Sequence, residues 1–559
     1  DMGRVDTDWL GTSGDNTYTT TQVSAGVKGK AFDRFTWDLT YAYGKSVIDS
    51  EVYGTKEANL AAAEFAVTDA SGAIVCGAVA SNPNFAANRL TNTIRPELVQ
   101  AGCTPLNPFG SGNVSAAAKA YVSGIEYTRN DIERNSVAAN IGGPLFALPA
   151  GDVSFAAGLE YRRDTLKQTA DALQELGLYS SGNNKTYAGR NSVKEGYLEV
   201  EVPVLKDLSF AKSLGVNAAV RRTDYDTSGA VTTWKVGGVY EPLDGLMFRI
   251  TRSRDIRAPS LSELFSIGGI SATGSFFNPF NGQSARLPVQ TMGNPDLKPE
   301  SADTLSYGVT YRVTGGPLSG LRMSADYYNI KLEDQIASVG ATDILQRCFE
   351  KVTAYCSAIQ FDSSTFGIAK VLTQPFNQSL MEAEGVDLEA GYRTNLDFIH
   401  LPGSLEVSAF ATHLRHLKTT DRPGPTGLTV DNAGTQAGSP KWVGLAYLNY
   451  RLDNLSVGLQ ARAFTEIRFS PRFFGPGEPG YDPALSTSIN KNTFPGLVYF
   501  NLNGTYDFEA AGRKFQVFGN VANLLNQEPP AFAIAAINLG GNPYDYVGRS
   551  FKLGLRFGF

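Results

Sequence analysis

Side chains alternate between apolar and polar along most of this 559-residue chain. In one segment Val153, Phe155, Leu159 and Tyr161 are apolar, and most residues between them are polar or small. Such alternation places successive side chains on opposite faces of a β-strand. The sequence contains about 17 such segments, most of them as long as the ~9 to 11 residues of a tilted membrane strand. They cover residues 18–29, 35–48, 131–142, 152–165, 191–204, 213–224, 231–241, 245–254, 302–313, 320–334, 382–393, 403–417, 440–452, 454–466, 497–508, 513–524 and 546–559.

The connections between these segments alternate between short and long. Tight turns are expected at 31–34 and 148–151, and long excursions at 49–130 and 166–190. The alternation continues to the end of the chain, and 225–230 is the one short link on the long side. Short periplasmic turns and long extracellular loops are typical of outer-membrane barrels. The two patterns together predict an all-β fold, a transmembrane antiparallel β-barrel.

The last segment has the sharpest alternation. Phe551, Leu553, Leu555, Phe557 and Phe559 share one face, and the residues between them are polar or small. A strand in lipid must pair its backbone amides and keep its outward face apolar. A terminal strand that ends in Phe559 also resembles the assembly signal read by the outer-membrane assembly machinery. The alternative is an ordinary buried edge strand, which would not explain the alternation of the loops.

Composition agrees with an all-β chain and excludes two classes of protein. Gly (58), Tyr (25) and Phe (32) are abundant, and no segment has the ~18 to 20 uninterrupted apolar residues of a membrane helix. The net charge of -6 gives no basic face for nucleic acid. The cysteines form two local pairs, Cys76 with Cys103 and Cys348 with Cys356, in expected extracellular loops. Two disulfides are favoured over a metal site, with cross-pairing left open for the first pair.

The start of the chain indicates a longer protein. Near Asp1 no basic segment precedes an apolar one, so no signal peptide is expected here. With a periplasmic C-terminus, about 17 strands would place Asp1 outside the cell, whereas single-chain bacterial barrels have even strand numbers and periplasmic ends. We therefore expect the chain to be truncated at its N-terminus.

Five short motifs resemble segments of TonB-dependent receptors, especially the large type of proteobacteria that live on dilute nutrients. They are Cys103–Phe109, Arg257–Ser260 with Leu261 to Phe265, Asn294–Glu300, Glu384–Glu389, and Asn523–Asn526 with Tyr544, Asp545, Gly548, Arg549 and Phe559. The resemblance implies that residues 1–559 are the barrel domain of such a receptor, supplying roughly the last 17 strands of an expected 22. We recognise no plug domain and no TonB box in the sequence.

The resemblance also implies a function. It suggests a receptor in the outer membrane of a Gram-negative bacterium that binds a scarce nutrient, such as siderophore-iron, cobalamin or an oligosaccharide, on extracellular loops. Import would use energy from the TonB-ExbB-ExbD complex, which would act through the missing N-terminal region. Lipid and lipopolysaccharide would surround the barrel, and no cofactor is implied. A passive porin or surface adhesin is the main alternative, and a soluble all-β carbohydrate enzyme is another.

No catalytic constellation or metal site is expected from the residues. His413 and His416 are three apart on an expected strand, so we expect them on opposite faces, which is wrong for one metal or active site. Charge on the lipid face costs about 2 to 4 kcal/mol at the midplane, so strand charges are expected to face the lumen. They include Lys194, Glu195, Glu199, Glu201, Arg221, Arg312, Asp387, Glu389, Arg393, Arg462, Lys552 and Arg556.

Aromatic residues are expected in two roles. Tyr and Trp near strand ends, such as Tyr161, Trp234 and Tyr450, are typical of an interfacial girdle. Ligand contacts are expected from the long loops, because binding residues concentrate on loops held by a rigid scaffold. Two loop clusters are candidates, with loop-loop packing as the alternative for both. They are Phe276, Phe277 and Phe280, and Arg472, Phe473 and Phe474.

Overall fold

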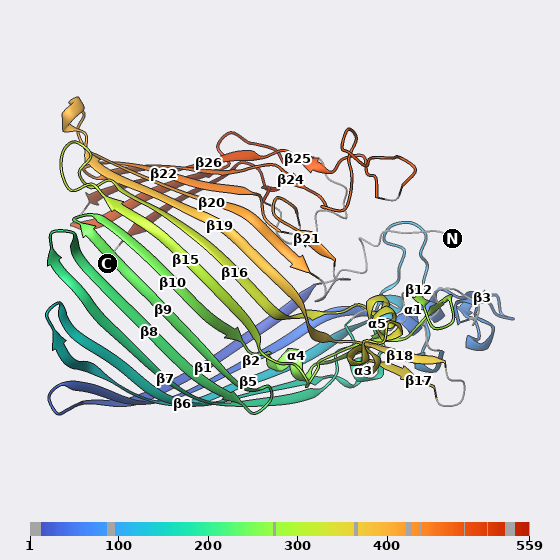
Figure 1. Cartoon of the computed structure of the whole chain (residues 1–559). Coiled ribbons are helices and arrows are strands. Elements are labelled where there is room, and N and C mark those ends of the chain that lie inside the picture. Colours follow the sequence, from blue (N-terminus) through green and yellow to red (C-terminus); the bar gives the residue numbers. More distant parts are fainter. Residues whose placement is uncertain are drawn as a thin grey trace.

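The computed structural model describes residues 13–85, 96–180, 182–271, 275–362, 367–420, 428–436, 438–485, 487–510, 512–530 and 543–557. Within them an antiparallel sheet of 18 strands forms a curved wall (Figure 1). One of the 18 is the short β21 (Thr429–Asp431), and the others pair in chain order from β1 (Gly14–Ala31) to β28 (Ser550–Phe557). Among the described residues no pairing joins β1 to β28, so both are edges of this sheet.

The 17 predicted segments are confirmed, each on one long strand of the wall. Between β1 and β28 these are β2 (Phe35–Thr55), β5 (Ser123–Leu148), β6 (Gly151–Ala170), β7 (Tyr187–Leu208), β8 (Ala211–Tyr225), β9 (Gly229–Leu243), β10 (Leu246–Arg257), β15 (Glu300–Arg312), β16 (Arg322–Ser338), β19 (Pro375–Asn395), β20 (Ser404–Thr420), β22 (Trp442–Leu452), β23 (Leu455–Phe464), β26 (Leu497–Ala510) and β27 (Arg513–Ala522). Several strands are longer than predicted, above all β5 with 26 residues.

Short turns lie at one end of the wall and long loops at the other. The loops contain the helices α1 (Glu57–Ala63), α2 (Ala116–Val122), α3 (Ala172–Leu176), α4 (Leu261–Phe265), α5 (Ala341–Phe349) and α6 (Thr353–Cys356). They also contain the short strands β3 (Ala66–Thr68), β4 (Ile74–Cys76), β11 (Ile267–Ser271), β12 (Ser275–Asn278), β13 (Gln283–Arg286), β14 (Val289–Met292), β17 (Ile359–Phe361), β18 (Ile368–Thr373), β24 (Ile467–Arg468) and β25 (Thr493–Phe494). Most of these elements gather at the right in Figure 1, opposite the turns. None of the helices in the described ranges is both long and apolar enough to cross a membrane.

The two faces of the wall differ in polarity. On one face Leu159 and Leu553 are 70% and 85% exposed, although both are strongly apolar. We call this the outer face, because exposed apolar side chains on a barrel are suited to lipid. Near the turns, the hydroxyl groups of Tyr240 and Tyr450 on this face donate to the carbonyls of Phe210 and Pro402. Such anchored tyrosines agree with the predicted interfacial girdle.

Lys194 is a correction to the predicted inward charges. In the register of β6 and β7, Lys194 lies opposite Tyr161, and Glu195 lies opposite Glu160. Directly opposed residues share one face of a sheet. Lys194 therefore lies on the outer face, whereas its neighbour Glu195 faces the lumen as predicted.

The histidine prediction is also wrong. His413 lies opposite Val386, and His416 lies opposite Glu384, so both are on the outer face. The strand contains one extra residue at this point, a β-bulge, and the bulge reverses the parity that simple alternation predicts. His413 stacks on Trp442 with ring centroids 4.4 Å apart, while His416 Nδ1 lies 2.7 Å from a carboxylate oxygen of Asp431. The two rings thus have separate partners.

Candidate ligand-binding mouth

Two long loops, 258–299 and 339–374, fold together into one unit, which we call the paired-loop unit. Its sheet has the order β11-β14-β18-β17, and β14 of the first loop pairs in parallel with β18 of the second. Its core combines apolar side chains of both loops, with Phe376 at the start of β19. The buried members are Leu287, Val339, Ala341, Ile344, Leu345, Cys348, Tyr355, Ala358, Ile359, Val371 and Phe376.

Amide side chains attach this unit to the wall. Asn294 Nδ2 donates to the Pro375 carbonyl at 2.9 Å. Asn377 accepts from the Lys298 amide and donates to the Lys298 carbonyl, both at 2.8 Å. The first loop is therefore bound at its end to the first residues of β19, and it is held like an extension of the rigid wall.

A charged network fixes the start of the first loop. Ser260 caps α4, and Glu263 completes the capping box with its own hydrogen bond to the Ser260 amide. Arg257 donates to Glu263 at 3.0 and 3.1 Å and to Glu300 at 2.7 Å twice. Burial would raise the pKa of the Glu263 carboxyl, but the hydrogen bonds from Arg257 and Ser260 hold that pKa below its usual value.

Helix α4 lies against the lumen side of β7. A Cβ atom at Gly189 would overlap the ring of Phe265, so glycine is required for this close approach. Between α4 and the wall is a cavity of about 800 Å³, within the range of small-molecule sites. Its polar lining includes Arg134, Arg162, Asp164, Tyr225, Arg257 and Ser260. Arg134 is paired with Asp164 at 2.6 Å, so these charges are neutralised within the wall.

The first predicted aromatic cluster lies on the paired-loop unit, in two different environments. Phe276 packs against the core of the unit. Phe277 is 51% exposed, and Phe280 is in edge contact with Phe349 and Phe361 at centroid distances of 5.7 and 6.3 Å. The exposed rings of this group form one surface. The sequence predicted only part of it, because Phe349 and Phe361 come from the second loop, 339–374.

The second predicted cluster lies in the loop 465–496. Phe473 stacks on Phe469 with centroids 6.0 Å apart, and Arg472 is exposed. Phe474 is half-buried, with its ring beside Gly480. No hydrogen bond, ion pair or ring contact joins this cluster to the first one within the described part of the chain.

The carboxylate of Glu478 connects several parts of the loop 465–496. Its carboxylate accepts from the Gly475 amide at 3.0 Å, from Asn492 at 3.4 Å and from Arg468 at 2.7 Å. The Gly475 amide is the largest influence, and with Asn492 and Arg468 it outweighs burial and holds the pKa of Glu478 below its usual value. The candidate residues Phe473 and Phe474 therefore lie on a loop whose shape depends on one ionised side chain.

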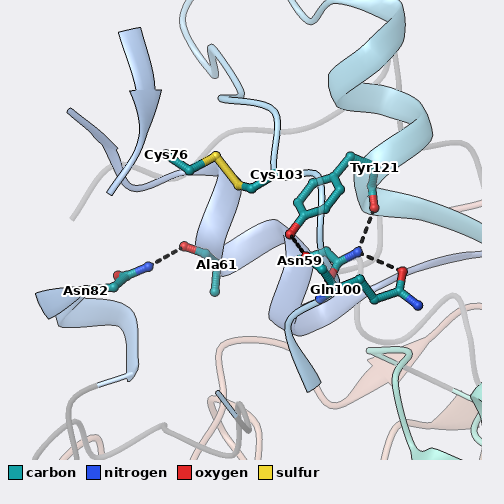
Figure 2. Close-up of a disulfide and its surroundings, with 7 residues drawn as sticks. All are labelled: Asn59, Ala61, Cys76, Asn82, Gln100, Cys103 and Tyr121. Carbon is teal, nitrogen blue, oxygen red and sulfur yellow. Dashed lines mark hydrogen bonds between the residues drawn. A yellow bond between two sulfur atoms is a disulfide. The ribbon is translucent and has the colours of Figure 1, made fainter. Parts of the chain in front are cut away.

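Both cysteine pairs are disulfide-bonded in the structure, Cys76 with Cys103 and Cys348 with Cys356. Figure 2 shows the first bond beside Asn59, a fully buried side chain. Asn59 donates to Gln100 at 3.1 Å and to the Tyr121 carbonyl at 2.9 Å, while the Tyr121 hydroxyl donates to the Gln100 carbonyl. This network joins α1, α2 and the segment between them, so the loop 56–122 has a core of its own.

In the described ranges no group of three or more His, Cys, Asp or Glu side chains is arranged to hold a metal ion. Phe559 and its role as an assembly signal lie outside the described residues.

A match to a known protein family identifies the family of this chain. The family described as "TonB dependent receptor-like, beta-barrel" matches residues 3–524. The chain belongs to this family. The resemblance expected from the five motifs is therefore confirmed. Proteins of this family are transport receptors rather than enzymes. Membership of the family indicates a location in the outer membrane of a Gram-negative bacterium.

Solved structures agree with the fold. A mutant of the ferric enterobactin receptor PfeA from Pseudomonas aeruginosa is 12% identical, with 98% of this chain and 71% of that chain covered and a TM-score of 0.52. The unliganded ferric citrate transporter FecA is 10% identical, with 97% and 62% covered and a TM-score of 0.52. At such identities the likeness shows the fold alone. No curated protein matches the sequence.

Proposed function

We propose that this TonB-dependent receptor barrel captures a scarce nutrient at its extracellular mouth and imports it with energy from the TonB-ExbB-ExbD complex. The nutrient classes are siderophore-bound iron, cobalamin and oligosaccharides. Ferric siderophores are the first to test, because the similar solved structures include receptors named for ferric enterobactin and ferric citrate.

The observation that carries this proposal is the rigid presentation of exposed aromatic rings. Phe277, Phe280 and Phe349 are about half exposed, although each belongs to a unit with a buried core and a disulfide. Apolar aromatic rings held in water on an ordered scaffold are suited to stacking against a ligand, because little conformational freedom is lost on binding. The cavity beneath α4 offers a second, more polar contact along the route into the lumen.

Binding by the purified full-length receptor tests the capture step. Ferric siderophores, cobalamin and oligosaccharides are titrated by calorimetry, and conductance is recorded after insertion into planar bilayers. The proposal predicts saturable binding of one class at micromolar concentration or tighter, with no steady open-channel current. A large ohmic conductance without binding of any class would contradict it and indicate a passive porin.

A further inference from the structure

A buried carboxylate lies beneath the loop that contains α3. Glu126 is near the start of the 26-residue β5, at the loop end of the wall. A tilted membrane strand needs only ~9 to 11 residues, so this end of β5 lies outside the membrane. Val137 of the same strand lies opposite Tyr161 on the outer face, and alternation places Glu126 on the lumen face. Glu126 is only 6% exposed, which is rare for a carboxylate without a paired cation.

The α3 loop, residues 171–180 and 182–186, covers this carboxylate. Two glycines leave the space that it fills, Gly182 of the loop and Gly54 of β2, because a Cβ atom at either position would overlap a Glu126 oxygen. The Asn183 amide donates to the carboxylate. Within the described part of the chain no cation forms an ion pair with Glu126. An ionised Glu126 is therefore poorly compensated while the loop is in this position.

The α3 loop also connects three parts of the mouth. Gln174 is fully buried and donates to a carbonyl of β5 at 2.7 Å. The Ser180 amide donates to the carbonyl of Thr55 at 2.8 Å, at the entrance to the loop 56–122. On the other side, a Cβ atom at Gly269 of β11 would lie 3.0 Å from the Asn183 Cβ, so the paired-loop unit is in close contact with the residue that donates to Glu126. Movement of the α3 loop would thus be felt by both of its neighbours.

The titratable groups around Glu126 favour its neutral form. Burial raises the pKa of Glu126 to about 7, with the Asn183 amide acting against this shift and the like charge of Asp171 adding to it. Tyr179 is also buried, and its pKa is raised to about 12, so it is uncharged at neutral pH. Lys56, next to β2, forms no ion pair with Glu126 among the described residues, and burial lowers its own pKa. Glu126 is therefore the group of this junction that changes charge near neutral pH.

We propose that Glu126 is a proton-operated latch for the α3 loop: the protonated carboxyl lets the loop close on the wall, and the ionised carboxylate releases it. In the closed position an ionised Glu126 is a buried charge beside Asp171, and opening returns it to water. Because the pKa is raised in the closed state, the stabilisation of closure is complete below the ordinary glutamate pKa of about 4.3 and is lost as pH rises through about 7. This inference rests on the packing of the loops and does not depend on nutrient import.

Hydrogen exchange of the full-length receptor in detergent tests the latch. Exchange is measured from pH 5 to pH 8.5 and corrected for its intrinsic pH dependence. We expect the protection of the α3 loop amides to fall at least tenfold over this range. Amides of β11 should change in the same direction, because β11 contacts Asn183. Protection of the α3 loop that stays constant across this range overturns the proposal.

Two matched substitutions identify the responsible group. Glu126→Gln keeps the size of the side chain but cannot ionise, so the α3 loop should stay protected at pH 8.5. Glu175→Gln removes an exposed carboxylate of the same loop, whose pKa is lowered by the Thr186 amide, and it should keep the pH response of the unsubstituted receptor. Unchanged exchange in β6 and β7 shows that both variants are folded. If Glu126→Gln responds to pH like the unsubstituted receptor, another group controls the loop and the latch is wrong.

Discussion

The guanidinium of Arg257 forms a two-point ion pair with the carboxylate of Glu300, 2.7 Å at each contact, where β10 ends and β15 begins. Glu300 is only 4% exposed, and it also accepts from the Ile336 amide at 2.6 Å. One buried carboxylate thus joins the start of the first loop, its end and the adjoining strand β16. The position of the paired-loop unit depends on this pair.

Arg257→Ala should release the paired-loop unit, because it leaves a buried carboxylate without its cation. We expect a loss of about 2–3 kcal/mol, seen as faster hydrogen exchange over residues 258–299. Arg254→Ala is the matched control, since Arg254 forms a similar two-point pair with Asp303 but in a more exposed setting. An exposed pair contributes below about 1 kcal/mol. Equal effects of both changes would contradict the anchoring role.

Phe276 lies in a different environment from Phe277 and Phe280, so we expect their alanine variants to behave differently. F277A and F280A should each weaken nutrient binding at least tenfold, and F277A should leave exchange over 339–374 unchanged, because its ring is exposed. F276A should instead speed exchange in the paired-loop unit, because its ring packs on the core. Calorimetry and hydrogen exchange on the same samples separate binding from folding. Undiminished affinity in F277A/F280A would exclude these rings from the ligand site.

Removing the disulfides should destabilise the two loop units to different extents. Cys76 and Cys103 are separated by 27 positions, and Cys348 and Cys356 by 8. In the chain-entropy argument, closing the longer loop contributes about 3.5 kcal/mol and the shorter about 2.5 kcal/mol. Limited proteolysis of the double Ala variants should show cleavage confined to the loop that lost its bond. Cleavage in the strands instead would show that the loops are not separate units.

The loop 465–496 should loosen at low pH. The pKa of Glu478 is lowered in the folded state, so its stabilising contribution is complete above the unfolded pKa and is lost as pH falls through the folded pKa. Hydrogen exchange in this loop, corrected for its intrinsic pH dependence, should rise as the pH is lowered from about 5, just above the ordinary glutamate pKa of about 4.3, to about 2. Glu478→Gln should exchange faster at neutral pH and lack this change. An identical pH response in both proteins would show that another group is responsible.

The strands were predictable because apolar and polar side chains alternate along each of them, as a strand with one face in lipid requires. The same rule failed at His416, where one extra residue in β20 reverses the parity, and no residue type in the sequence marks that bulge. It also failed at Lys194. Near the interface a charge on the outer face costs little free energy, so the outward residues there need not be apolar.

The loops were predictable only in part. Their lengths and local cysteine pairs were visible in the sequence. The parallel pairing of β14 with β18 was not, because it joins segments about 80 residues apart through backbone hydrogen bonds that carry no residue signature. For the same reason the sequence offered Phe280 as a candidate without Phe349 and Phe361.

Energy-coupled import is the central claim, and uptake by cells tests it most directly. The full-length receptor is expressed in a strain without competing receptors, and accumulation of the bound nutrient is measured with and without TonB. We predict that uptake saturates at low concentration and stops when TonB is deleted, while surface binding persists. Uptake that continues undiminished without TonB would contradict the account.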